Sequence, residues 1–156
     1  MTVQPIPDGF RTVTPHLIID GCAKALDFYG EAFGAQELMR APMEGTDKLM
    51  HASIKIGDSI VMLADAFPDW GSPGPDPKRN SPVMIHLFVE DVDAAYDRAV
   101  KAGATAVMPV QDQFWGDRYG LVQDPFGHRW SIATRTKDLT PEEMAEGARK
   151  AFGGGQ

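Results

Sequence analysis

The chain carries an internal repeat that limits what it can fold into. Residues His16–Asp20 read HLIID and residues His86–Glu90 read HLFVE, 86 − 16 = 70 positions later. In each copy an apolar run is followed by an alanine-rich stretch of helical spacing and then by short strand-like segments. Two copies are too few for a solenoid. The repeat therefore predicts a duplicated βαβββ module, an α+β fold in which residues 1–156 form a single domain. The same offset relates Ala25 to Ala95, Asp27 to Asp97 and Gly57 to Gly127.

Local signals set the expected bounds of module one, about residues 12–65. A strand at Val13–Ile19 leads into a helix at Cys22–Phe33, which Asp20 can cap and Gly34 ends. Three more strands are predicted at Glu37–Met43, Lys48–Ile56 and Ser59–Ala64, the middle one with Met50, Ala52, Ile54 and Ile56 on one face.

Module two, residues 83–135, repeats this order after a linker at 66–82 that is rich in proline and glycine. Asp91 caps a predicted helix at Val92–Ala102, and Gly103 ends it. A C-terminal helix over 140–152 is indicated by Thr140, Pro141 and Glu143, the pattern of a capping box with proline at the first helical position. The remaining strands are predicted at Val83–Val89 and near Thr105–Val110, Tyr119–Gln123 and Arg129–Thr134.

Composition excludes several classes of partner. With 15 basic and 22 acidic residues the net charge is −7, which disfavours nucleic acid and anionic membranes. No apolar stretch approaches the roughly 20 residues of a membrane span, and the first residues have no signal-peptide core. Cys22 is the only cysteine, so no intrachain disulfide is possible and a cytoplasmic location is expected. A helix start could lower the pKa of Cys22, but no catalytic signature surrounds it, which favours a small buried cysteine.

Six short motifs resemble the vicinal oxygen chelate superfamily of glyoxalase I, bleomycin-resistance proteins, fosfomycin-resistance enzymes and extradiol dioxygenases, and in particular its PhnB-like branch. The resemblance covers roughly residues 12–137, and the last two motifs are the most specific. It implies that the modules form a cupped, mixed sheet that closes around a groove. The motifs are VTPHL at 13–17, DFY at 27–29, IGDS at 56–59, VEDV at 89–92, DQFWGDR at 112–118 and DPFGH at 124–128.

The resemblance also implies where a metal would bind. Enzymes of this superfamily hold a divalent metal with one side chain near the start and one near the end of each module, typically histidine and glutamate. Alignment on the motifs places these positions at Thr14, Met84 and Ser131, with the fourth at Val61 or Met62. None of these is a histidine or a carboxylate, and thioethers are poor ligands for Mg, Mn, Ni or Zn. The usual metal site is therefore expected to be absent, and no cofactor is expected.

His16 and His86 keep an alternative open. Each lies two residues after one of these positions, so in an extended strand it points to the same face. One interpretation is a displaced metal site with two histidines. The other is a pair of metal-free, hydrogen-bonded polar residues in the groove, which could still act as acid or base near neutral pH.

The segment around Gly116 is a second candidate. Trp115 offers a stacking surface, and Asp117 with Arg118 offers both signs of charge. These residues would form one wall of a pocket for an aromatic or cationic ligand, or else an ion pair that pins a loop to the sheet. His128 is expected to be exposed after a turn at 124–127. Met50, Met62 and Met84 would line an adaptable groove or simply fill the core.

Two functional hypotheses follow. The first is a glyoxalase/bleomycin-resistance-like protein that binds a small organic molecule in the groove without the usual metal. The alternative is a metal-dependent lyase or dioxygenase that uses His16 and His86. Homodimerisation is expected in either case, since the family commonly completes its grooves across a two-fold axis. Met144, Ala148 and Phe152 also give the C-terminal helix an apolar stripe.

Overall fold

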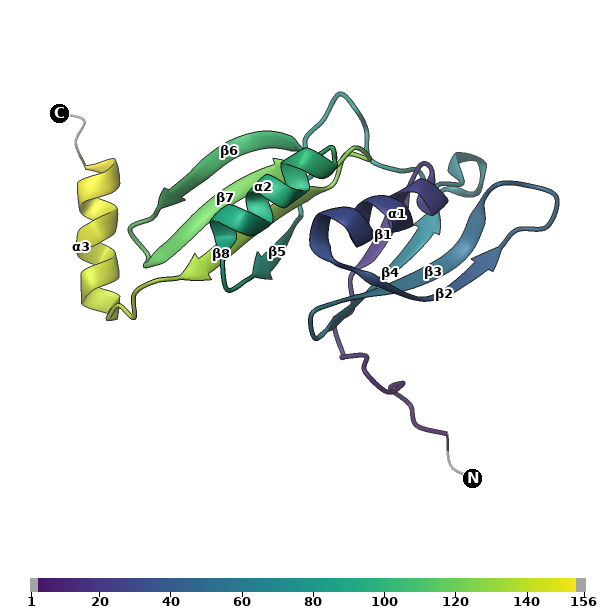
Figure 1. Ribbon diagram of the computed structural model, residues 1–156, viewed down its shortest axis with the longest axis horizontal. Helices are drawn as coiled ribbons and strands as arrows, with labels where there is room; N and C mark the ends of the chain where they lie inside the picture. Colours follow the sequence, from purple (N-terminus) through teal and green to yellow (C-terminus); the bar gives the residue numbers. More distant parts are fainter. Residues whose placement is uncertain (1–2, 154–156) are drawn as a thin grey trace. The chain divides into compact units, whose positions relative to one another are not determined.

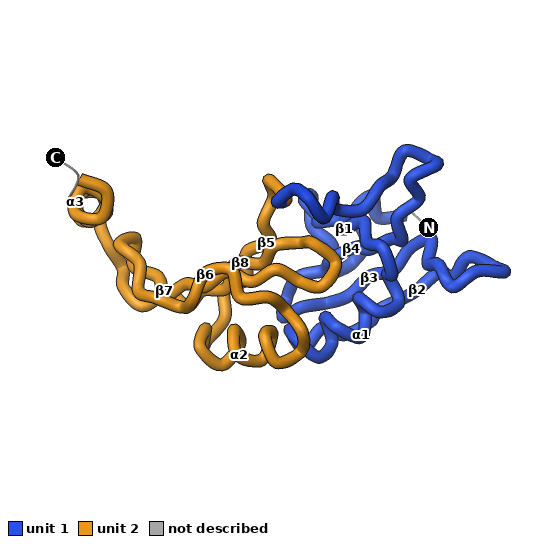
Figure 2. The backbone as a smooth tube through the Cα atoms, turned by 90° about the horizontal axis from the view of Figure 1, so that it is seen from above, with its two compact units in different colours: residues 1–80 blue, residues 81–156 orange. Residues whose placement is uncertain are grey.

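Each half of the repeat folds into one four-stranded mixed sheet with a helix on one face (Figure 1). The computed structural model describes residues 3–153 and separates at Asn80 and Ser81 into two compact units, coloured blue and orange in Figure 2. Unit 1 holds β1 (His16–Ile19), α1 (Cys22–Phe33), β2 (Gln36–Pro42), β3 (Leu49–Ile56), β4 (Ser59–Asp65) and the short 3₁₀ helix η1 (Pro68–Trp70).

Unit 2 repeats the arrangement and adds a C-terminal helix. It holds β5 (Met84–Phe88), α2 (Val92–Ala102), β6 (Thr105–Asp112), β7 (Asp117–Gln123), β8 (Arg129–Arg135) and α3 (Pro141–Phe152). The strand order is β1-β4-β3-β2 in one sheet and β5-β8-β7-β6 in the other, with the first pair parallel and the others antiparallel. The predicted α+β fold with two βαβββ modules and a C-terminal helix is confirmed.

The last strand of each module holds the start of that module's helix. In unit 1 the buried Asp65 carboxylate accepts hydrogen bonds from the backbone N–H groups of Gly21 and Cys22, at 3.1 and 3.2 Å. In unit 2 the Thr134 hydroxyl accepts from the Val92 N–H at 2.9 Å and donates to the Val89 carbonyl. Both side chains satisfy helix N–H groups that have no partner within the helix.

This contact corrects the prediction that Asp20 caps α1. The N-cap residue is Gly21 in a left-handed conformation, and no side chain of the cap itself accepts a hydrogen bond. The prediction for α2 is confirmed, because Asp91 is the N-cap and accepts from the Ala94 N–H. The capping box at Thr140 and Glu143 is also confirmed in α3.

The hydrophobic core of each unit lies between its sheet and its helix. In unit 1 it contains Ile19, Tyr29 and Leu63, and in unit 2 Trp130 and Ile132, all fully buried. The predicted alternation of β3 holds for Ala52 and Ile54 but ends at Met50, which is 46% exposed. In the described residues, no helix is long and apolar enough to cross a membrane.

Candidate functional site

The face of each sheet that lies opposite its helix carries the two predicted site histidines. In β5 every second side chain, from Met84 through His86 to Phe88, points to this face, and Met84 and Phe88 are 49% and 69% exposed. In β1 the neighbours Leu17 and Ile19 are buried, whereas His16 is exposed. A strand places alternate side chains on opposite faces, so each histidine lies on the face that its helix leaves open.

In unit 2 the open face holds an ordered group of polar and aromatic side chains around His86. Its Nδ1 lies 2.7 Å from the hydroxyl of Ser131, which is buried and is the strand partner of His86 on β8. The imidazole stacks on Tyr119, with centroids 6.1 Å apart and planes at 18°, and meets the Phe88 ring edge-on at 4.4 Å. The structure thus brings together His86 and Ser131 and adds Tyr119 and Phe88, which the sequence analysis did not single out.

Trp115 extends this group from the β6–β7 turn. Its ring meets Tyr119 edge-on at 5.5 Å, and its indole N–H donates to the Asp117 carboxylate at 2.9 Å. The turn is closed by Gly116, whose φ of 96° favours glycine and where a Cβ atom would lie 2.7 Å from the Lys137 carbonyl oxygen. The Gly116 carbonyl accepts from the backbone N–H groups of Thr136 and Lys137. The Trp115 ring is therefore presented from a turn that is fixed to the segment after β8.

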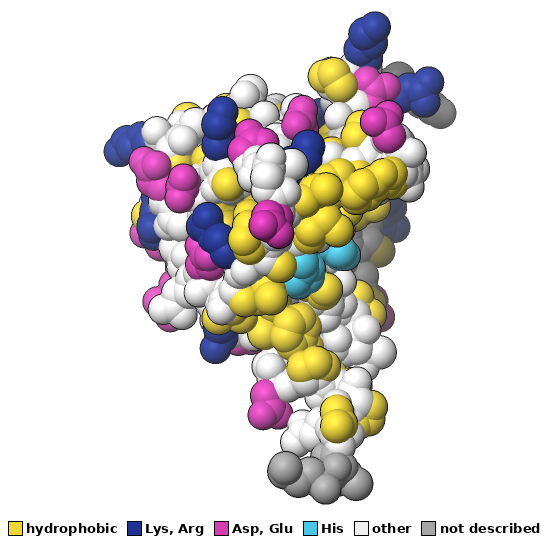
Figure 3. All heavy atoms as spheres, turned by 90° about the vertical axis from the view of Figure 1, so that its right-hand side faces the viewer, with side chains coloured by type: hydrophobic (Ala, Val, Ile, Leu, Met, Phe, Trp, Pro, Cys, Tyr) yellow, Lys and Arg dark blue, Asp and Glu magenta, His cyan; other side chains and the backbone are white. Residues whose placement is uncertain are grey.

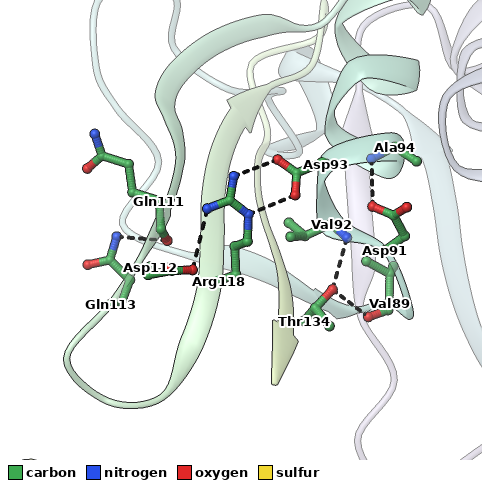
Figure 4. A network of polar contacts seen from close by, with 10 residues as sticks. All are labelled: Val89, Asp91, Val92, Asp93, Ala94, Gln111, Asp112, Gln113, Arg118 and Thr134. Atoms are coloured by element: carbon green, nitrogen blue, oxygen red, sulfur yellow. Dashed lines mark hydrogen bonds and ion pairs between the residues drawn. The ribbon is translucent and has the colours of Figure 1, made fainter. Parts of the chain in front are cut away.

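Arg118 lies apart from this group. It follows Asp117 by one residue in β7 and so points to the helix-covered face, where it pairs with Asp93 of α2 at 2.7 and 2.8 Å and with Asp112 at 3.4 Å (Figure 4). This hydrogen-bonded pairing lowers the pKa of Asp93 and raises that of Arg118. Arg118 thus forms ion pairs with Asp93 and Asp112 and not with its neighbour Asp117, and the structure does not bring it together with His86.

In unit 1 the open face joins His16 to a histidine that sequence reasoning missed. The rings of His16 and His51 meet edge-on with centroids 5.7 Å apart and planes at 78°. Met62 is the strand partner of both His16 and Ser53, so it lies between β1 and β3 on this face. Thr14 precedes β1 and donates to the Arg11 carbonyl. His51 has no counterpart in the repeat, since position 121 is leucine, and only the strand alternation of β3 could have indicated it.

The family's metal positions do not carry suitable donors. In strand register His16 lies opposite Met62, and His86 lies opposite Ser131. Met62, and not the buried Val61, is therefore the counterpart of Ser131. The four positions Thr14, Met62, Met84 and Ser131 then offer two hydroxyls and two thioethers, and the Ser131 hydroxyl is engaged by His86. Carboxylates suit Mg and Mn, and imidazoles suit Zn, Ni and Fe, so this set does not fit the metal that the family implies.

Partial loss of hydration makes both site histidines weaker bases than usual, although both side chains stay exposed. Desolvation lowers the pKa of His16, and the nearby His51 lowers it further. Desolvation also lowers the pKa of His86, although the negative charge of Asp117 acts to raise it. A histidine whose pKa is lower in the folded state binds a proton more readily in the unfolded state. Its contribution to stability is therefore present above the unfolded-state pKa of about 6.5, and it is lost as the pH falls through the folded-state pKa. We expect imidazole proton resonances of both residues to titrate with midpoints below about 6.5. A titration midpoint above about 6.5 for His86 would show that its ring is not desolvated by its neighbours.

Cys22 is not a nucleophile in this fold. It is fully buried at the start of α1, and burial together with the nearby Asp65 raises the pKa of the thiol to about 12. The thiolate is the reactive form, so we expect no labelling by iodoacetamide at about pH 8 in the native protein and complete labelling in urea. Stoichiometric labelling of the native protein within minutes would show that the thiol is accessible.

A surface depression of about 420 Å³ lies elsewhere in unit 2. It is lined by Arg135, Thr136, Lys137 and Asp138, in the segment between β8 and α3. None of the predicted site residues lines it, and its walls are charged and open. We therefore place the candidate site on the aromatic face and not in this depression.

Comparison with known proteins agrees with this fold. An uncharacterized protein of Mycobacterium tuberculosis is 47% identical over 136 residues, covering 85% of this chain and 79% of the relative. The crystal structure of TioX from Micromonospora sp. ML1 is 30% identical, with a TM-score of 0.61 over 83% of this chain and all of that one. A PhnB protein from Bacillus cereus, 14% identical, shares the fold with a TM-score of 0.63 over 80% of this chain and 99% of that one. The family model of the Glyoxalase/Bleomycin resistance protein/Dioxygenase superfamily matches residues 11–132, and the chain belongs to that superfamily.

Proposed function

We propose that the protein binds a small, planar organic molecule on the open face of unit 2 and does so without the metal that the family's enzymes use. The observation that carries the proposal is the continuous group formed by His86, Phe88, Trp115 and Tyr119 around the hydroxyl of Ser131. Aromatic side chains bind planar ligands by stacking, and a few fixed polar groups orient them.

The arrangement of this face suits a ligand that is aromatic and either neutral or cationic. Asp117 accepts a hydrogen bond from Trp115 and contributes a negative charge that acts on His86. The imidazole is held in place by Ser131 and stays neutral above its lowered pKa, so it offers a hydrogen bond without a positive charge. The net charge of −7 also favours a cation over an anion.

A screen by thermal shift and tryptophan fluorescence tests the proposal. The probes are planar aromatic cations such as acridinium and quinolinium salts, compared with small oxo-acids and with divalent metals alone. A ligand at roughly 100 times its Kd stabilises the native state by about 2.7 kcal/mol. We expect aromatic cations to raise the melting temperature and to quench the fluorescence of Trp115.

Variants locate the site. Trp115→Ala and His86→Ala are each expected to weaken binding at least tenfold. Trp70→Ala is the matched control, because Trp70 is 63% exposed but belongs to unit 1. Equal loss in all three variants, or stabilisation by oxo-acids only, would overturn the proposal.

The metal-dependent alternative makes a different prediction for the same protein. A lyase or dioxygenase that uses His16 and His86 would retain a nearly stoichiometric divalent metal through purification without chelator. The binding function predicts that EDTA leaves the melting temperature of the purified protein unchanged. A fall of several degrees that one particular ion reverses, and that is absent in the His16→Ala/His86→Ala variant, would replace our proposal with the enzymatic one.

We further propose that the protein is a cytoplasmic homodimer. Phe88 and Phe152 are 69% and 79% exposed, and Met144 is 37% exposed on α3. Large exposed apolar side chains commonly mark surfaces that a partner covers. Light scattering at micromolar concentration is expected to give about 34 kDa, twice the chain mass of 17.0 kDa. A mass of one chain would exclude a stable dimer.

A further inference from the structure

The histidine pair of unit 1 has the spacing of two ligands of one metal ion. The ring centroids of His16 and His51 are 5.7 Å apart and their planes are nearly perpendicular, at 78°. Imidazole nitrogens bind a transition metal at about 2.0–2.1 Å, which puts the centroids of two such rings roughly 5–6 Å apart. The centroid separation of the two rings therefore falls in the range that two imidazole ligands of one ion require.

The surroundings of the pair supply a third donor of a particular kind. Met62 pairs with His16 across β1 and β4 and with Ser53 across β4 and β3, and Ser53 is two residues from His51 on the same face. The register thus places Met62 on the same face of the sheet as both histidines. Within residues 3–153 no cluster of three or more histidine, cysteine, aspartate or glutamate side chains could hold a metal. The two histidine nitrogens and the Met62 sulfur are therefore the donors that this face offers to an ion.

A metal ion binds the neutral form of an imidazole and shares the site with the side chains around it. Figure 3 shows histidine side chains on this side of the molecule with hydrophobic side chains next to them.

We propose that His16 and His51 form a binding site for copper, with Met62 as a weak additional ligand. Among divalent first-row ions copper(II) binds nitrogen ligands most tightly, and a thioether suits copper(I) but not zinc, magnesium or manganese. Two imidazoles hold copper less firmly than a complete protein shell, so we expect the site to exchange its ion and to take up added copper. This site goes beyond the ligand binding proposed above, because it uses neither His86 nor any other residue of unit 2.

Copper titration of the untagged full-length protein tests the proposal. Copper(II) is added as its glycine complex and followed by electron paramagnetic resonance. We expect one ion per chain with hyperfine structure from two nitrogens. His16→Gln and His51→Gln are each expected to lower the affinity at least tenfold. His128→Gln and His86→Gln are the matched controls and are expected to bind as the unmodified protein does. Zinc is expected to bind at least tenfold more weakly than copper.

Two further measurements test the site without relying on variants that could fail to fold. In the unmodified protein, substoichiometric copper(II) should broaden the imidazole proton resonances of His16 and His51 before those of His86 and His128. Met62→Leu preserves the volume of the side chain and is expected to weaken the retention of copper(I) while leaving the nitrogen hyperfine pattern of copper(II) unchanged. Equal broadening of all histidines, or unchanged affinity in both the His16 and His51 variants, would overturn the proposal. Loss of copper in the His86 variant would also overturn it and would point to the shared two-histidine site of the metalloenzyme alternative.

Discussion

Replacing Asp65 with alanine is expected to lower the free energy of unfolding by about 3–5 kcal/mol, because it leaves several buried backbone donors without a partner. The carboxylate is only 2% exposed and accepts from the N–H groups of Gly21, Cys22 and Leu49, the last at 2.6 Å. It therefore ties the end of β4 both to the start of α1 and to the start of β3. Urea denaturation followed by circular dichroism measures the loss.

Two variants separate this role from a general effect of charge. Asp65→Asn keeps the shape of the side chain but replaces one acceptor oxygen with a donor group, so we expect an intermediate loss. Asp20→Ala removes an exposed carboxylate at the same helix start that does not cap it, and its effect should stay within about 0.5 kcal/mol. A loss in Asp20→Ala as large as that in Asp65→Ala would contradict the assignment of the cap.

The different roles of Asp20 and Asp65 show how far the sequence could predict this fold. The bounds of α1 and α2 are predicted correctly because local signals fix them: Gly34 and Gly103 end the helices, and Asp91 caps the second. The cap of α1 comes from Asp65, which is 44 positions from Gly21 along the chain. Such a contact leaves no local signature, and Asp65 stands where β4 meets a segment rich in proline and glycine.

The sequence likewise predicts some residues of the candidate site and misses others. Strand alternation and the repeat together predict His86 and Ser131 on one face, where the structure shows their hydrogen bond. The repeat cannot indicate His51, because that residue has no counterpart in the second module. Arg118 is next to Asp117 in the sequence, but adjacent residues of a strand point to opposite faces, so the two do not share a pocket wall. The shared groove of His16 and His86 stays a prediction.

Replacing Asp124 with alanine is expected to cost about 3–5 kcal/mol of unfolding free energy, since one buried carboxylate organises the turn between β7 and β8. Asp124 is 3% exposed and accepts from the backbone N–H groups of Phe126 and His128, each at 2.9 Å. Its second oxygen accepts from the indole N–H of Trp130, also at 2.9 Å, and Trp130 is the largest fully buried side chain of the protein's described core. This network gives a physical reason for the DPFGH motif. Aspartate is the residue that closes the turn and anchors the core at once.

A Trp130 variant separates the contact of Asp124 with the core from its contacts with the turn. Trp130→Phe removes the indole donor and leaves the backbone contacts of Asp124 with Phe126 and His128 in place. We expect a loss of about 1–3 kcal/mol, arising from the lost bond and the smaller ring. In the double variant Asp124→Ala/Trp130→Phe the total should fall short of the sum by at least about 0.5 kcal/mol, because the shared hydrogen bond is lost only once. Chemical denaturation of all three variants measures this coupling, and strict additivity would show that the indole and the carboxylate act independently.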